Sequence, residues 1–231
     1  MKPLKQLLAF LSLTVIGSLS SSAATLATYS IAGGSLTSVN DPSVTTTAIS
    51  NTSASGFGAS SGSSTLFLRA DVSNSTLALA ITNNDYIQFT LTPTVGNVIE
   101  LNSISFDHRA SNTFATSFTS NLSVFAFRNT PAPAPAAGGE VGTSSLSAPF
   151  SSGSVVLLAA DVTFTLGMVF QNLTSADTVT FRIYGFDDAN DSNQINRLND
   201  IKINGTVVPE PSSLLLLGAG LGLALGRRKR G

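Results

Sequence analysis

Apolar and polar side chains alternate along Tyr86-Ile87-Gln88-Phe89-Thr90-Leu91-Thr92. Successive side chains of a β-strand point to opposite faces, so this alternation puts Ile87, Phe89 and Leu91 on one face. The stretch Thr178-Val179-Thr180-Phe181-Arg182-Ile183-Tyr184 repeats the pattern. Both stretches therefore predict half-buried strands, each with one apolar face that packs against another layer.

Other short apolar runs lie between polar turns along the rest of the chain. The further candidate strands are Thr65–Ala70, Leu77–Ile81, Val98–Asp107, Leu122–Arg128, Val155–Leu158, Val162–Leu166 and Leu198–Val207. No long segment carries a 3.6-residue apolar period, so we expect an all-β, antiparallel β-sandwich over residues 25–207. The Pro/Ala/Gly-rich stretch 130–139 (TPAPAPAAGG) is interpreted as an exposed loop of this sandwich, and a linker between two domains is the alternative.

The composition of the 231 residues excludes several classes of protein. There is no Cys, which removes disulfide scaffolds, thiol nucleophiles and zinc fingers. A net charge of −1 argues against nucleic acid as a partner. Residues 25–208 hold 12 acidic and 6 basic residues, or 12 − 6 = 6 net negative charges, so half of the 12 basic residues flank apolar runs at the two ends. That distribution is typical of membrane targeting.

The N-terminal segment has the order of a secretory signal. Lys2 and Lys5 precede the apolar run 7–19, and the small residues 20–24 follow it. As a helix the apolar run spans about 20 Å, less than a hydrocarbon core of ~30 Å. We predict a signal peptide over residues 1–24 that is read by the Sec translocon and cleaved after Ala24. Cleavage after Ala23 or Ala27, or an uncleaved anchor, are the alternatives.

The C-terminal segment, residues 208–231, has three parts in a fixed order. They are Pro209-Glu210-Pro211, the apolar run 212–226, and the basic cluster Arg227, Arg228, Lys229 and Arg230. The prolines interrupt a helix, whereas the 15-residue apolar run forms a transmembrane helix of only about 22 Å. By the positive-inside rule the basic cluster stays in the cytoplasm, and the body then lies outside the inner membrane.

This tail resembles the PEP-CTERM sorting signal of Gram-negative bacteria that make exopolysaccharide. The resemblance implies recognition by an exosortase, transient anchoring in the inner membrane, and transfer to the cell surface or extracellular matrix. The short apolar run departs from a permanent anchor. The stretches 181–185 and 198–206 also resemble the last two strands of jelly-roll domains seen in many PEP-CTERM proteins, which are similar in outline to carbohydrate-binding sandwiches.

Catalytic residues are scarce in the body. His108 is the only histidine, and Asp107 beside it would point to the opposite face of a strand, so the two do not form part of a Ser-His-Asp triad. We interpret His108 as a surface or strand-end residue. No pair of carboxylates is singled out for glycoside hydrolysis. The chain is therefore predicted not to be an enzyme.

An oxygen-rich run is the one candidate metal site. Asp187, Asp188, Asn190 and Asp191 offer the hard oxygen ligands that Ca²⁺ prefers. Some carbohydrate-binding sandwiches hold a structural calcium near their last strands, and the jelly-roll resemblance implies the same here. A polar turn between two strands is the alternative. No other cofactor is expected.

The sequence thus predicts an exported, non-enzymatic surface or matrix protein, sorted by an exosortase and associated with exopolysaccharide or biofilm. A carbohydrate-binding module or a secreted carbohydrate-active enzyme with the same tail are the alternatives. Sugar binding would rely on exposed aromatic side chains, and in the absence of Trp the tyrosines are Tyr29, Tyr86 and Tyr184.

Overall fold

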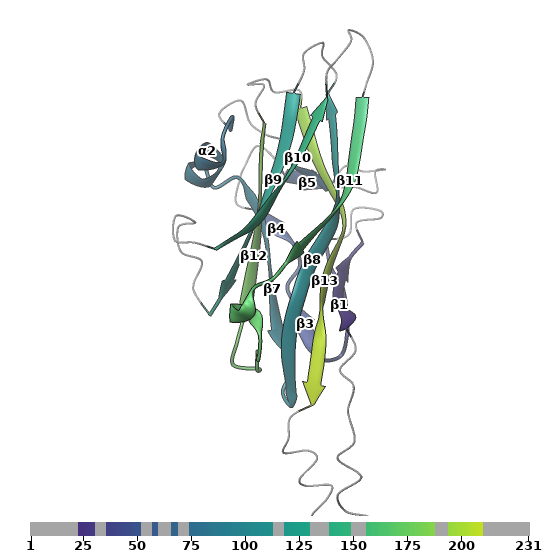
Figure 1. The fold of residues 1–231 in the computed structure, drawn as a ribbon, viewed down its shortest axis with the longest axis vertical. Helices are drawn as coiled ribbons and strands as arrows, with labels where there is room; N and C mark the ends of the chain where they lie inside the picture. Colours follow the sequence, from purple (N-terminus) through teal and green to yellow (C-terminus); the bar gives the residue numbers. More distant parts are fainter. Residues whose placement is uncertain are drawn as a thin grey trace, which may run out of the picture.

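The computed structural model describes residues 23–30, 36–51, 57–59, 66–68, 74–112, 118–129, 139–148, 156–187 and 194–209. Within these ranges the strands form two antiparallel sheets that face one another (Figure 1). The predicted all-β, antiparallel sandwich is confirmed. No helix within these ranges is both long enough and apolar enough to cross a bilayer.

Sheet A contains seven of the strands that the structure describes, and β13 lies at its centre. They are β1 (Ala23–Tyr29), β2 (Val39–Asn40), β5 (Phe57–Ala59), β6 (Leu66–Leu68), β8 (Asn97–Asn112), β11 (Val156–Thr165) and β13 (Gln194–Pro209). Their order is β11-β8-β13-β1-β2, and β6 pairs with the N-terminal part of β13 and with β5.

Sheet B contains six of the described strands, with β12 in the middle. They are β3 (Val44–Thr46), β4 (Ser50–Asn51), β7 (Tyr86–Pro93), β9 (Phe118–Arg128), β10 (Glu140–Ala148) and β12 (Val179–Asp187). Their order is β10-β9-β12-β7-β3, and β4 pairs with β7. Because β8 pairs with β11 and β9 pairs with β12, strands from both sides of residues 130–138 contribute to each sheet.

The core lies between the sheets, and the alternation along the stretches 86–92 and 178–184 places their apolar side chains in it. Ile87, Phe89 and Leu91 of β7 are at most 1% exposed, and Phe181 of β12 is fully buried. The ring of Phe89 stacks on that of Phe181 with centroids 5.2 Å apart. Burying each such side chain contributes roughly 1.5–3 kcal/mol to folding, so these strands fix how the sheets face each other.

Three predicted strands differ from the structure. Leu77–Ile81 was predicted as a strand and is instead part of the helix α2 (Leu77–Thr82). The Oγ1 of Thr76 accepts a hydrogen bond from the N–H of Leu79 at 3.3 Å, which caps the first turn, and Leu and Ala favour the helix that follows. The predicted strands Val155–Leu158 and Val162–Leu166 belong to the single strand β11.

Candidate functional site

The sorting segment begins inside sheet A. Val207, Val208 and Pro209 are the last three residues of β13, and each pairs with a residue of β8, Pro209 with Asn97. The Pro-Glu-Pro sequence therefore starts on a strand that is paired with β8, with no spacer between the sandwich and the motif. Glu210, Pro211, the apolar run and the basic cluster Arg227–Arg230 lie outside the described residues.

The strand that follows the predicted signal peptide lies beside the end of β13. Ala23 pairs with Thr206 and Ala24 pairs with Gly205. A Cβ on Gly205 would lie only 2.5 Å from the carbonyl oxygen of Glu100 in β8, so glycine is needed where β13 passes close to β8. Since β1 and β13 are antiparallel, the first and last described residues lie at the same end of the sandwich (Figure 1).

The position of β1 bears on where the signal is cut. Leu26 is fully buried and Ala27 is 1% exposed. Cleavage after Ala27 would remove Leu26 from the core, whereas cleavage after Ala24 would remove only the first two residues of β1. Ala24 therefore stays our prediction for the cleavage site, and residues 1–22 lie outside the described residues.

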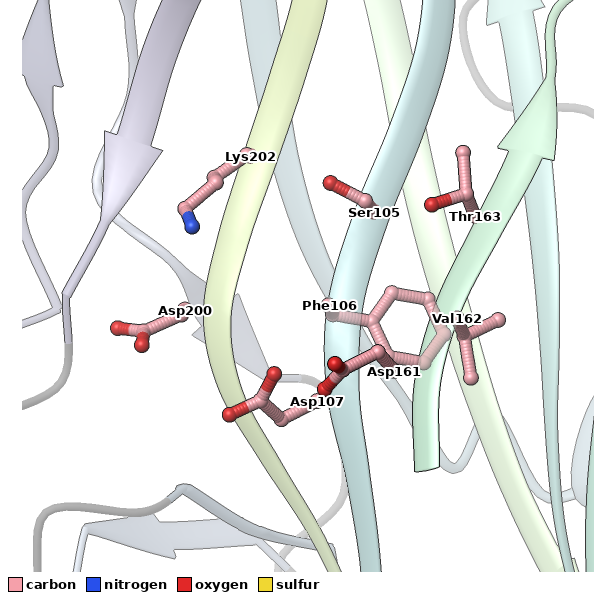
Figure 2. A pocket seen from close by; sticks show the side chains of 8 residues that line it. All are labelled: Ser105, Phe106, Asp107, Asp161, Val162, Thr163, Asp200 and Lys202. Carbon is pink, nitrogen blue, oxygen red and sulfur yellow. The ribbon is translucent and has the colours of Figure 1, made fainter. Parts of the chain in front are cut away.

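The outer face of sheet A carries a polar hollow of about 230 Å³. Figure 2 shows its side chains, which come from the three neighbouring strands β8, β11 and β13. They are Ser105, Phe106, Asp107, Asp161, Val162, Thr163, Asp200 and Lys202, which we call the aspartate pocket. Asp161 pairs with Asp107 across β11 and β8, so both carboxylates point to the outer face.

A β-bulge brings a third carboxylate to this pocket. The register between β13 and β8 shifts between Asn199 and Lys202, which leaves one extra residue on β13. Asp200 lies in this bulge with a φ of 49°, a left-handed conformation that Asp tolerates better than most residues. Its Oδ1 accepts a hydrogen bond of 3.4 Å from the hydroxyl of Ser30. The bulge therefore brings the Asp200 carboxylate close enough to Asp107 for its negative charge to raise the pKa of Asp107.

The three carboxylates make proton binding easier at Asp107. Partial burial raises the pKa of Asp107 most, followed by a hydrogen bond with Asp161 and the negative charges of Asp161 and Asp200, while Arg109 lowers it. Arg109 makes the opposing ion pair, with Nη2 at 3.5 Å from Oδ2 of Asp107. The pocket can thus accept hydrogen bonds from hydroxyl groups or hold a proton. Among the described side chains no group of three His, Cys, Asp or Glu residues is placed to hold a metal ion.

The expectation that His108 lies on the surface or at a strand end is wrong. It is fully buried within β8, between the two sheets. Its Nδ1 is 2.9 Å from Oγ of Ser144 and its Nε2 is 3.0 Å from Oγ of Ser120, both on sheet B. Burial lowers the pKa of His108 to about 4. Asp107 points outward, as predicted, so His108 joins the two sheets and is not oriented by a carboxylate.

The outer face of sheet B is aromatic and closed. Tyr86, Phe125, Phe127 and Tyr184 form a cluster, each 7% exposed or less, against which Leu77 and Ile81 of α2 pack. The guanidinium of Arg182 lies 4.2 Å from the centre of the Tyr86 ring, and its Nε donates to Gln88 Oε1 at 2.9 Å. We call this group the aromatic cluster; its rings are used in packing.

None of the three tyrosines offers a stacking platform for a sugar. Tyr29 and Tyr184 are fully buried, and Tyr86 is 7% exposed. Burial raises the pKa of Tyr184, although Arg182 opposes this shift. The expectation that sugar binding would use exposed tyrosines is therefore wrong for this chain.

The structure describes one residue of the oxygen-rich run. Asp187 ends β12 and is 3% exposed, and its N–H donates to the carbonyl oxygen of Asn74 at 3.2 Å. Asp188, Asn190 and Asp191 lie outside the described residues. Calcium binding at this run stays a prediction.

Comparison with known proteins identifies the tail. Residues 207–230 match the sequence family described as the PEP-CTERM protein-sorting motif. The motif implies that the chain is exported, anchored in the membrane, processed by an exosortase and sorted to the surface. The match begins at Val207, so it includes the last three residues of β13. No curated protein matches this chain.

Two solved structures of carbohydrate-binding modules resemble the body weakly. The first is Caldicellulosiruptor saccharolyticus CBM27-1 in complex with mannohexaose, with 10% identity, a TM-score of 0.39, and coverage of 79% of this chain and 96% of that chain. The second is TmCBM61 in complex with β-1,4-galactotriose, with 9% identity, a TM-score of 0.23, and coverage of 78% and 94%. At these scores neither likeness informs on a ligand.

Proposed function

We propose that this chain is a non-enzymatic exported protein whose β-sandwich is displayed at the cell surface or in an exopolysaccharide matrix. The observation that carries the proposal is the sorting motif at residues 207–230, which continues directly from the central strand β13. An exosortase recognises Pro209-Glu210-Pro211, acts near it, and releases the sandwich from its transient membrane anchor. The partners are therefore the Sec translocon, the exosortase and extracellular polysaccharide.

The arrangement of the strands supports this sequence of events. Ala23 and Thr206 are paired, so the chain enters and leaves the sandwich at one end. A signal peptide that ends at Ala24 and an apolar helix after Pro209 then reach the same membrane without the chain crossing the body. Both segments have their basic residues on the side opposite the sandwich, which favours a body outside the inner membrane.

The environment of His108 bears on whether the body is an enzyme. Both nitrogens of His108 are used in hydrogen bonds between the sheets, so this side chain has no free position for a substrate. Asp107 and Asp161 are the pair on which the enzyme hypothesis should be tested, since the pKa of Asp107 is raised and glycoside hydrolysis uses one carboxylic acid with a raised pKa beside a second carboxylate.

The competing hypothesis is a sugar-binding module, and the aspartate pocket is the place to test it. Its carboxylates and Lys202 can form hydrogen bonds with sugar hydroxyls, although no aromatic platform accompanies them. Glycan-array binding by the wild type that is lost in Asp161→Ala and retained in Val39→Ala would favour this hypothesis. Loss of hydrolytic activity in Asp107→Asn, with the fold intact, would favour the enzyme.

The sorting proposal is tested in the native host. Replacing Pro209, Glu210 and Pro211 with alanine should trap the full-length protein in the inner membrane, because the exosortase loses its recognition sequence. The same replacement at Pro131 and Pro133 is a matched control with the sequence Pro-Ala-Pro. Deleting residues 212–231 should instead release an unsorted body into the periplasm. An immunoblot of membrane, surface and medium fractions gives the distribution, and wild-type processing of the alanine variant would disprove the proposal.

A further inference from the structure

Three of the most exposed apolar side chains lie at one end of the sandwich. Val95 is 88% exposed, Met168 is 90% exposed and Val169 is 58% exposed. In the part of the chain that the structure describes, only Val39 and Leu79 are comparable large apolar residues on the surface. We call Val95, Met168 and Val169 the apolar tip.

The apolar tip lies at the end where β13 finishes. Val95 is in the turn between β7 and β8, and the residue after this turn, Asn97, pairs with Pro209. The short helix η4 (Met168–Phe170) lies beside the first residues of β8, because Ile99 and Leu173 exchange two hydrogen bonds of 2.8 Å. In Figure 1 the turn before β8 and the end of β13 lie together at the lower end of the molecule.

A partly buried ion pair fixes the shape of η4. The Nε of Arg128 donates to Oδ1 of Asp177 at 3.0 Å, and its Nη1 donates to the carbonyl oxygen of Val169 at 3.0 Å. Asp177 also accepts the N–H of Thr174 at 2.8 Å. These hydrogen bonds outweigh the effect of burial and hold the pKa of Asp177 far below its usual range. Met168 and Val169 are therefore presented to the outside by a rigid support.

The short segment between Pro209 and the apolar run limits how far the apolar tip can lie from the membrane. Five peptide steps separate Pro209, the last paired residue, from Leu214 in the apolar run. Fully extended, they span at most about 17 Å. When the apolar run is in the bilayer, the end of the sandwich lies within that distance of the membrane, and Ala23, which pairs with Thr206, lies at the same end.

We infer that the apolar tip contacts the bilayer surface while the protein is anchored, and so orients the sandwich for the exosortase. The inference rests on the proposed function, because it requires the anchored intermediate. The titratable groups of the described chain near this end are Asp41, Glu100 and the paired Arg128 and Asp177. Since no excess of basic side chains lies there, the contact is apolar and should not weaken when salt is raised.

The absence of Cys from the chain makes a site-specific test possible. Full-length protein carrying Val95→Cys or Met168→Cys is labelled with an environment-sensitive fluorophore and reconstituted into phosphatidylcholine vesicles. Val39→Cys is the matched control, since Val39 is 78% exposed and pairs near the far end of β1. We expect a blue shift of emission and quenching by spin-labelled lipid at positions 95 and 168 but not at 39, unchanged by high salt.

Flotation of the same vesicles separates the two levels of the inference. If the protein floats with the vesicles but labels at 95 and 168 behave like the label at 39, the contact is wrong and the anchor stands. If the protein does not float, the anchored intermediate fails, and the contact fails with it. Quenching that disappears at high salt would also overturn the apolar contact.

Discussion

The outer faces of the two sheets follow the same alternation of residues, but the outer face of sheet B is covered and that of sheet A is exposed to solvent. On sheet B the outward positions of β7, β9 and β12 carry the aromatic cluster, which α2 helps to close. On sheet A the outward positions of β8 and β11 carry Asp107 and Asp161, which stay open to solvent. The alternation along a strand thus determines which side chains share a face. Whether that face is buried or exposed depends on whether another element, such as α2 on sheet B, covers it.

The largest change in the free energy of unfolding should come from truncating a side chain of the aromatic cluster on sheet B. Phe125 is 3% exposed and its ring meets that of Tyr184 edge-on, with centroids 5.3 Å apart. Phe125→Ala should lower the free energy of unfolding by about 3–5 kcal/mol, because it leaves a cavity under the cluster. Thr163→Ala on the open face of sheet A is the control and should change it by less than about 0.5 kcal/mol. Equal losses in urea unfolding would mean that both outer faces are surface.

His108 lies between the sheets, and its burial should make stability depend on pH. Its pKa in the folded protein is lowered to about 4 by burial, against about 6.5 in an unfolded chain. Stability should therefore be complete above pH 6.5 and decline as the pH falls toward 4, by about 3 kcal/mol at the acid end. His108→Gln removes this dependence. Urea unfolding of both proteins across that range measures it, and parallel profiles would contradict a buried neutral histidine.

The smallest effect belongs to the open face. The raised pKa of Asp107 means that its ionised form is disfavoured in the folded protein, so this carboxyl adds stability at low pH that is lost as the pH rises through its folded pKa. Asp107→Asn should raise the melting temperature slightly at pH 7, with a gain of less than about 1 kcal/mol in the free energy of unfolding, and should not change it at pH 3.

Asp41 gives a control of opposite sign. Hydrogen bonds from the side chain and N–H of Ser43 lower the pKa of Asp41. Asp41→Asn should therefore lower the melting temperature at pH 7, and the loss should shrink as the pH falls below the ordinary carboxyl range. If both asparagine variants shift in the same direction, the two carboxyls are not held in different environments.

Local patterns predicted the central strands well because alternation is a property of neighbouring residues. They failed at Leu77–Ile81, where an apolar run fits a strand or a helix and the cap at Thr76 decides between them. They also missed β10, whose Ser- and Thr-rich residues carry little apolar signal at a sheet edge. Pairing with β9 defines that strand, and pairing is not visible in a single stretch.

The candidate sites show the same division. The alternation that puts Ile104 and Phe106 in the core also includes His108, so its burial was readable from the sequence. The aspartate pocket could not be predicted from the sequence, because Asp107, Asp161 and Asp200 come from three separate strands. The position of Asp200 also depends on a β-bulge. The sorting motif was predicted because its parts are contiguous in the chain.

Removal of the tail by an exosortase is tested most directly by the intact mass of the protein that reaches the surface. Protein is collected from the surface or medium of the native host, and its C-terminal peptide is sequenced by mass spectrometry. We predict a chain that ends near Pro209–Pro211 and lacks residues 212–231. A surface form that retains Arg227–Gly231 would contradict it.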